Sequence, residues 1–225
     1  MQQGYKHMQK PLFISVEGGD GAGKGTQIKM LTDWLNTQFI QFIITREPGG
    51  CETAELLRSL VVEGEDDKWD GLSEALLYST ARNEHLRKTI RPALAKGTWV
   101  ICDRFADSTT VYQGEGRGIE RTALLQLHNL VVAETWPDLT LILDVDPEIG
   151  IARSKANVHE GGEVNKETRF ESLDMSFHQR VRAGFLKVAA ENTDRCKVID
   201  AEGQPADVHA RIIKTIQSYL ESAAA

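Results

Sequence analysis

A glycine-rich loop between an apolar run and an amphipathic segment most limits how this chain can fold. Residues 18–26 read Gly-Gly-Asp-Gly-Ala-Gly-Lys-Gly-Thr and follow the apolar run of residues 11–16. Glycine lets backbone N–H groups turn inward, and a helix N-terminus presents free N–H groups to an anion. Lys24 adds a cation that can reach nucleotide phosphates. The sequence therefore predicts a strand, a phosphate-binding loop and a helix, with the loop formed by Gly18, Gly19, Asp20, Gly21, Ala22, Gly23, Lys24, Gly25 and Thr26.

One position of this loop departs from the usual G-x-x-x-x-G-K-[ST] pattern. Gly25 stands where Ser or Thr normally follows the lysine, and Thr26 comes one place later. That hydroxyl is the usual protein ligand of Mg²⁺ in such loops, so the ligand is either missing or displaced to Thr26. The alternative, a glycine-rich turn without a ligand, is disfavoured because the loop joins a strand to a helix.

Strand-like and helix-like segments alternate along the whole chain. Apolar runs predict strands at 11–17, 39–45, 98–102, 139–145 and 196–199. Helical periodicity predicts helices at 25–37, 52–62, 72–91, 107–113, 121–134 and 147–155, and two more around 173–188 and 208–219. This alternation predicts an α/β fold of three layers, with about five parallel strands between helices on both faces.

Length and charge limit the domain count and the class of partner. We expect the 225 residues to form one domain, in which residues 1–9 are a leader. The 26 basic and 33 acidic residues give a net charge of −7, which argues against nucleic-acid and membrane-surface partners. The cysteines Cys51, Cys102 and Cys196 are odd in number and widely spaced, so we expect neither disulfides nor a zinc site, and a cytoplasmic protein.

Charged and glycine-containing segments follow three of the predicted strands. These are residues 17–26, 46–50 and 103–108. In parallel sheets ligands bind at the carboxyl ends of strands, so the three segments predict one site for a polyanion. Arg46 could hold a phosphate with two hydrogen bonds, although a surface pair with Glu47 is the alternative. Asp103 could orient Mg²⁺ through water or simply cap a turn, and Arg104 faces the same edge.

Tyr78 and Arg82 lie four residues apart on a predicted helix, so they share one face. An aromatic ring could stack on a nucleotide base while the arginine donates to a carbonyl oxygen of that base. Taken alone, such a pair is more often an ordinary amphipathic ridge.

Several motifs together resemble the thymidylate kinase family. They are the phosphate loop, Thr45-Arg46-Glu47-Pro48-Gly49-Gly50, Asp103-Arg104-Phe105 with Ser108, Tyr112-Gln113-Gly114, residues 137–145, and Thr168-Arg169-Phe170-Glu171. The resemblance runs from about Leu12 to the last helix, and the joint occurrence is far more specific than any single motif. It implies a P-loop NTPase-like fold, with ATP as phosphate donor, dTMP as acceptor and Mg²⁺ as the metal.

The resemblance also implies roles for individual residues. The loop residues Gly18 to Thr26 are expected to bind ATP, and Lys24, Arg104 and Arg169 to be catalytic. The expected dTMP-binding residues are Asp20, Arg46, Glu47, Tyr78, Arg82, Arg104, Ser108, Thr109, Tyr112 and Gln113. The metal candidates are Asp103 and Thr26. Tyr78 departs mildly from the family, in which phenylalanine is commoner.

A lid and a dimer are the remaining expectations. The polar segment 153–169 carries Arg153, Lys155, Lys166 and Arg169 and is expected to form the lid, although a solvated loop is the alternative and is favoured for the first three. Arg169 matches the lid arginine usual in bacterial members. Position 21 is glycine, whereas one branch of the family has a basic residue there. The family is usually homodimeric, and the predicted helices at 52–62, 72–91 and 121–134 could supply the apolar face.

Two rival functions remain at this stage. Gly-Ala-Gly-Lys-Gly-Thr-Gln also resembles the loop of adenylate kinases, and nucleoside kinases carry an Asp-Arg pair after a strand. The segment Arg46 to Gly50 argues against both of these kinases. The rival from another class is a nucleotide-dependent switch ATPase, although no switch segments are evident.

Overall fold

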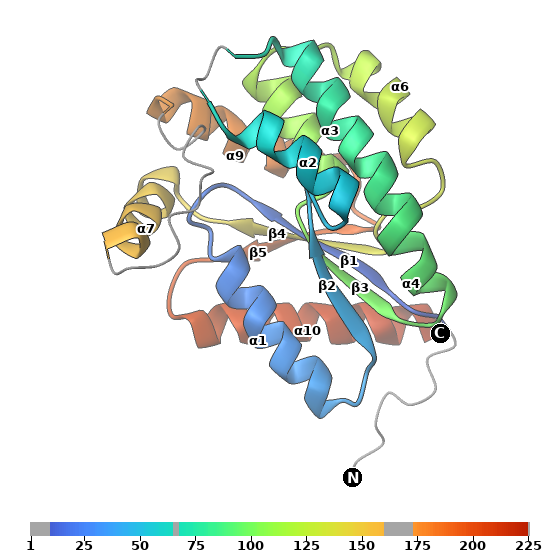
Figure 1. The fold of residues 1–225 in the computed structure, drawn as a ribbon. Helices are drawn as coiled ribbons and strands as arrows, with labels where there is room; N and C mark the ends of the chain where they lie inside the picture. The colour runs from blue at the N-terminus through green and yellow to red at the C-terminus, as the bar shows by residue number, and fades with distance from the viewer. Residues whose placement is uncertain (1–9, 65–67, 160–172, 225) are drawn as a thin grey trace.

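The computed structural model describes residues 10–64, 68–159 and 173–224. Five strands form one parallel sheet in the order β2-β3-β1-β4-β5 (Figure 1). The strands are β1 (Phe13–Gly18), β2 (Phe42–Arg46), β3 (Trp99–Asp103), β4 (Leu139–Asp144) and β5 (Cys196–Asp200). The predicted α/β fold with a five-stranded parallel sheet is confirmed.

The register of the sheet brings the predicted polar strand ends to one edge. Arg46 at the end of β2 lies opposite Asp103 at the end of β3. Val16 of β1 also lies opposite Asp103, and Gly18 lies opposite Leu143 of β4. The phosphate loop therefore leaves the central strand directly beside β3, and the two segments predicted to share its site follow β3 and β2, the two strands on that side.

Helices cover both faces of the sheet (Figure 1). On one face lie α1 (Lys24–Thr37) and α10 (Pro205–Ala224), which contact each other. On the other lie α2 (Glu52–Val62), α3 (Gly71–His85), α4 (Arg91–Ala95), α5 (Ala106–Thr109), α6 (Arg121–Val131) and α9 (Met175–Glu191). Helix α7 (Pro147–His159) lies beside the carboxyl edge of the sheet.

The strands bury alternate residues against the two helical layers, as the twofold repeat of a strand requires. Ile14 and Ile101 pack in the cluster with α1 and α10, whereas Phe13 and Val100 pack in the cluster on the opposite face. Both faces of the central strands are thus apolar. This explains why their sequences are continuous apolar runs.

Three of the predicted boundaries are wrong in detail. The second strand starts at Phe42 and not at residue 39, because the exposed Phe39 has a left-handed backbone (φ 56°) and forms the turn after α1. The helical region predicted at 72–91 runs through a π-helical segment, η1 (Leu86–Ile90), into α4. The helix predicted at 107–113 does not break at Gly114, because α5 continues as the π-helical segment η2 (Thr110–Gly116).

Two further expectations concern the chain ends and the lid. The expected leader at residues 1–9 lies outside the described residues, as do residues 160–172 of the lid region. Residues 153–159 of the expected lid are the last part of α7. Among the helices that the structure describes, none combines the length and the apolar composition needed to cross a bilayer.

Candidate active site

The loop after β1 has the backbone geometry of an anion cradle. Gly18, Gly21 and Gly23 all have positive φ angles, of 138°, 68° and 89°, a region that glycine enters without strain. A Cβ atom at Gly18 would lie 2.5 Å from the carbonyl oxygen of Leu143, so the loop can sit against β4 only with glycine at this position. Gly23 ends the loop, and α1 begins at Lys24 with its free N–H groups facing the loop.

Lys24 and Arg104 both donate hydrogen bonds to backbone carbonyl oxygens of this loop. Lys24 Nζ donates to the carbonyl oxygens of Gly18 (3.2 Å) and Gly19 (3.0 Å). Arg104 donates to Gly18 O and to Asp20 Oδ1, each at 3.0 Å. Burial and the nearby Arg104 guanidinium lower the pKa of Lys24 to about 8. A polyphosphate bound beside this amino group would favour the charged form of Lys24.

Arg104 itself has a left-handed backbone, with φ of 66°. Such a conformation is costly for a non-glycine residue and is found most often at functional sites. Its side chain is half-buried, lies 5.0 Å from the ring centre of Tyr112, and receives support from Ser108 Oγ at 3.3 Å. The segment after β3 therefore holds a permanent cation beside the phosphate loop.

Glu17, the last polar residue of β1, connects the strand before the phosphate loop to the segment that follows β3. Its side chain is fully buried and accepts from the backbone N–H of Phe105 (2.6 Å), while Ser108 Oγ lies 2.6 Å from its second oxygen. Burial, reinforced by the nearby Asp107, raises the pKa of Glu17 to about 8. Burial thus favours the protonated form of Glu17, and its two hydrogen bonds join the loop that carries Arg104 to the strand that leads into the phosphate loop.

A cavity of about 610 Å³, open to solvent, lies next to this cluster. Apart from Arg46, every residue predicted to bind dTMP lines it. Its walls comprise Asp20, Glu47, Pro48, Val62, Tyr78, Arg82, Arg104, Phe105, Ser108, Thr109, Tyr112 and Gln113. Tyr78 and Arg82 reach it from the same face of α3, as their spacing predicted.

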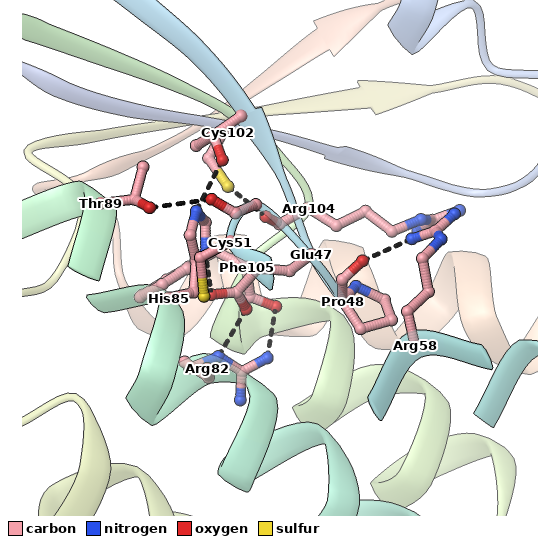
Figure 2. A network of polar contacts seen from close by, with 12 residues as sticks. Glu47, Pro48, Cys51, Arg58, Arg82, His85, Thr89, Cys102, Arg104 and Phe105 are labelled. Carbon is pink, nitrogen blue, oxygen red and sulfur yellow. Dashed lines mark hydrogen bonds and ion pairs between the residues drawn. The ribbon is translucent and has the colours of Figure 1, made fainter. Parts of the chain in front are cut away.

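Arg82 is a buried residue in the lining of this cavity, and its contacts with Glu47 and Phe105 are shown in Figure 2. Its Nε donates to Glu47 Oε2 at 2.7 Å, and its Nη2 donates to Thr109 Oγ1 at 3.0 Å and to Phe105 O at 3.3 Å. Its Nη1 is buried and has no hydrogen-bond partner among the described residues. A buried guanidinium donor without a partner is costly, so the cavity is suited to a ligand that accepts there.

Arg46 and Arg58 add positive charge beside the cavity. The predicted alternative of an Arg46–Glu47 surface pair is wrong, because Glu47 is buried on Arg82 and Arg46 pairs with Glu55 at 3.2 Å. The Arg46 side chain remains 54% exposed at the edge of the sheet. Arg58 of α2 donates to the carbonyl oxygen of Pro48 at 2.5 Å (Figure 2).

Sequence reasoning missed four residues of this region: Pro48, Arg58, Val62 and Phe105. Arg58 and Val62 are four residues apart on α2, so their shared face was readable from the helix predicted at 52–62. Phe105 follows Arg104 directly, and its ring lies 5.3 Å from the Arg82 guanidinium. No pattern in the sequence pointed to that contact, because the two residues come from different elements.

Two carboxylate oxygens near the loop are suited to a metal. Asp103 Oδ1 and Asp20 Oδ2 are buried and have no hydrogen-bond partner in the described part of the chain. Mg²⁺ prefers such oxygens and commonly takes only one or two carboxylates together with phosphate oxygens and water. No group of three or more His, Cys, Asp or Glu residues among those described could hold a metal without such extra ligands. Thr26 is exposed on the first turn of α1.

Of the lid residues, only those in α7 can be located. Arg153 Nη1 donates to the carbonyl oxygen of Ala201, after β5, at 3.0 Å. Arg169 and Lys166 lie outside the described residues.

The match to a family model decides the relationship of the chain. Residues 16–212 match the model described as thymidylate kinase. The chain belongs to the thymidylate kinase family. A thymidylate kinase of Magnetococcus marinus is 50% identical over 201 residues, which are 89% of this chain and 92% of that protein. One from Jannaschia sp. is 50% identical over 206 residues, covering 92% and 95% of the two chains.

The fold comparison agrees with this assignment. The crystal structure of thymidylate kinase from Ehrlichia chaffeensis superposes with a TM-score of 0.72 at 37% identity, covering 92% of this chain and 99% of that one. The thymidylate kinase resemblance predicted from the motifs is therefore confirmed. The matched region contains the phosphate loop from Gly18 and all the cavity residues.

Proposed function

We propose that the chain transfers the γ-phosphoryl group of ATP to dTMP, giving dTDP and ADP. Phosphorylation of dTMP is the function of the thymidylate kinase family, to which the chain belongs. One observation carries the assignment to this site: the cavity with the unpartnered Arg82 donor opens directly beside the phosphate loop. Donor and acceptor nucleotides can therefore place their phosphates next to each other across Asp20 and Arg104.

The cavity supports a pyrimidine deoxynucleotide as acceptor. Arg82 Nη1 would donate to a carbonyl oxygen of the base, and the half-buried ring of Tyr78 would stack on it. Thr109 holds Arg82, and Gln113 is held in turn by Glu74 at 3.2 Å. Tyr112 is 7% exposed and packs between Phe177 and Phe185, so its ring is a rigid wall for the sugar.

The charges around the loop support phosphoryl transfer. An acceptor phosphate oxygen forms the new bond to the γ-phosphorus as the bond to the ADP oxygen breaks, and charge spreads over the transferred oxygens. We assign Lys24 and Arg104, which both contact the phosphate loop, to stabilising that charge, and the exposed Arg46 to holding the acceptor phosphate. Asp20, whose second oxygen is unpartnered, would accept from the sugar 3′-hydroxyl or face the metal. We keep Arg169 as a third catalytic cation on the basis of the motif alone.

Mg²⁺ is the metal that we propose for this site. It would be held by the phosphates, with Asp103 and Asp20 as the nearby carboxylates, and it would neutralise charge on the transferred group. Thr26 remains the weaker candidate because it is exposed.

A homodimer is our proposal for the assembly. Exposed leucines gather on three adjacent helices: Leu56 and Leu60 on α2, Leu72 and Leu76 on α3, and Leu125 and Leu130 on α6. Such a concentration of large apolar side chains on one face is typical of a protein interface. We also propose a single kinase domain with a lid at 153–169, and a cytoplasmic location in keeping with three free cysteines.

The test of the function is coupled ADP release with a panel of acceptors: dTMP, dUMP, UMP, AMP, CMP and thymidine. We expect turnover to be fastest with dTMP and absent with thymidine, which lacks the acceptor phosphate. ADP release without any acceptor would favour a switch ATPase, and preference for AMP or thymidine would favour one of the rival kinases.

A further inference from the structure

His85 occupies a position that the reaction described above leaves unexplained. It is the last residue of α3, its side chain is fully buried, and it does not line the cavity. Its Nδ1 lies 3.0 Å from Glu47 Oε1 (Figure 2), and its Nε2 lies 2.6 Å from Thr45 Oγ1. The ring therefore joins the end of β2 to the carboxylate that holds Arg82.

The polarity of these bonds follows from the groups involved. A carboxylate only accepts, so Nδ1 must donate to Glu47. In the neutral ring Nε2 then accepts from the Thr45 hydroxyl, which fixes both the tautomer and the ring plane. The contact between His85 and Thr45 requires a glycine at position 50. A Cβ atom at Gly50 would lie 2.3 Å from His85 Nε2 and 2.4 Å from Thr45 Oγ1.

Glu47 divides its two oxygens between two residues of the same helix. Oε1 accepts from His85, and Oε2 accepts from Arg82 Nε at 2.7 Å. Because His85 occupies Oε1, the carboxylate takes only one donor of the guanidinium. Nη2 is then engaged by Thr109 and Phe105 O, and Nη1 is left for the cavity.

We propose that His85 is a positioning residue for base recognition, which keeps Arg82 Nη1 available to the nucleotide by occupying the second oxygen of Glu47. This proposal rests on the proposed function, in which Arg82 binds the base. Without the His85 donor, Oε1 would be a buried acceptor without a partner. The carboxylate would then gain most by taking Nη2 of Arg82 together with Nε in a bidentate pair, because these two N–H groups lie on the same side of the guanidinium and match a carboxylate. Nη2 would leave Thr109 Oγ1 and Phe105 O, which now fix the plane of the guanidinium, and Nη1 would no longer be held toward the base.

The chain offers a matched set of variants at this position. Asn places its amide nitrogen near the site of Nδ1 and can still donate to Glu47. Gln places its amide near the site of Nε2, where it contacts Thr45 and not Glu47. Phe fills a similar volume and keeps neither bond. Binding of dTMP and of 2-deoxyribose 5-phosphate, which has no base, is measured by calorimetry for the wild type, His85→Asn, His85→Gln, His85→Phe and Arg82→Ala, and the melting temperature is measured for each.

The proposal predicts a loss of affinity only for the ligand that carries a base. We expect His85→Phe and His85→Gln to weaken dTMP binding about tenfold, His85→Asn to stay within about threefold of wild type, and 2-deoxyribose 5-phosphate binding to change little. Equal losses for His85→Asn and His85→Gln, or parallel losses for the two ligands, would show a packing role and overturn the proposal. If His85→Phe does not fold, the comparison of Asn with Gln, together with Thr45→Val, decides the matter.

Arg82→Ala separates this proposal from the proposed function. If Arg82→Ala weakens dTMP binding but not 2-deoxyribose 5-phosphate binding, and His85→Phe leaves both unchanged, only the role of His85 is wrong. If Arg82→Ala does not affect dTMP binding, the assignment of the base site is wrong, and the His85 proposal fails with it.

Discussion

Gly21 of the phosphate loop and Gly150 of α7 approach so closely that no side chain fits between them. A Cβ atom at Gly21 would lie 1.8 Å from the carbonyl oxygen of Gly150, and one at Gly150 would lie 2.5 Å from the carbonyl oxygen of Asp20. No side chain fits at position 21, so a cation for the transferred phosphoryl group has to come from another segment, such as the one that carries Arg104.

We expect Gly150→Ala to lower kcat at least tenfold and to raise the KM for ATP, because the new methyl group pushes on the loop at Asp20. Alanine is favoured over glycine within a helix by about 1 kcal/mol, so a loss of activity would not reflect a weaker helix. Steady-state kinetics provide the measurement, with Ala152→Ser, which is exposed on the same helix, as the control. Unchanged kinetics for Gly150→Ala would mean that α7 can move to accommodate the methyl group without displacing the phosphate loop.

Lys24→Met should keep the fold and lower kcat at least about a hundredfold, since it removes a cation that matters most while the γ-phosphoryl group is in transfer. Among the described residues, the Lys24 side chain hydrogen-bonds only to loop carbonyls, so we expect the variant to fold. Circular dichroism checks the fold, and coupled ADP release gives kcat. A folded variant with nearly normal kcat would contradict the role of Lys24.

The ring of Tyr112 should determine the preference for deoxyribose. A ribose 2′-hydroxyl placed against a buried ring finds no partner, which costs about 1–3 kcal/mol, so we expect a roughly ten- to hundredfold preference for dUMP over UMP. Tyr112→Leu should narrow this ratio of kcat/KM values, whereas Tyr112→Phe, which keeps the ring, should preserve it. The same ratio in wild type and Tyr112→Leu would assign the discrimination to another residue.

Stability should depend on pH through Glu17. Its pKa rises from the ordinary value of 4.5 to about 8 in the folded chain, chiefly through burial. A raised folded pKa means that the contribution of Glu17 is complete below about pH 4.5 and is lost as pH rises through about 8. Glu17→Gln removes this titration, so the variant should gain at least about 1 kcal/mol relative to wild type between pH 5 and pH 9. Urea unfolding at pH 5, 7 and 9 measures the difference, and parallel pH profiles would refute the assignment.

The exposed leucines should hold the proposed dimer together. Leu76 is 46% exposed on α3, in the middle helix of the three, so Leu76→Glu should place a charge within the interface and halve the mass measured by light scattering. Ile149→Glu on α7 introduces the same charge at an exposed apolar residue elsewhere and should leave the mass unchanged. A monomeric wild type, or loss of the dimer in both variants, would exclude this face.

The features that the sequence predicted best are the helices and strands, which have a local periodicity, and the loops that directly follow strands. The phosphate loop between β1 and α1, the parallel sheet and the pair of Tyr78 with Arg82 all follow from spacing, because strands and helices repeat over a few residues. Family motifs predicted the other residues of the cavity wall except Pro48, Val62 and Phe105. The exact ends of elements were less predictable, as at Phe39, where a left-handed turn delays the strand.

Only the tertiary structure decided which buried polar groups form hydrogen bonds or ion pairs with each other. Nothing in the sequence indicates that Glu47 binds Arg82 and His85 instead of its neighbour Arg46, or that the carboxyl group of Glu17 is buried against Ser108 with a raised pKa. These choices depend on burial and on distances between residues that are 35 to 91 positions apart. Periodicity encodes which face of an element is buried, whereas the partner of a buried charge is fixed only when separate elements pack together and exclude water.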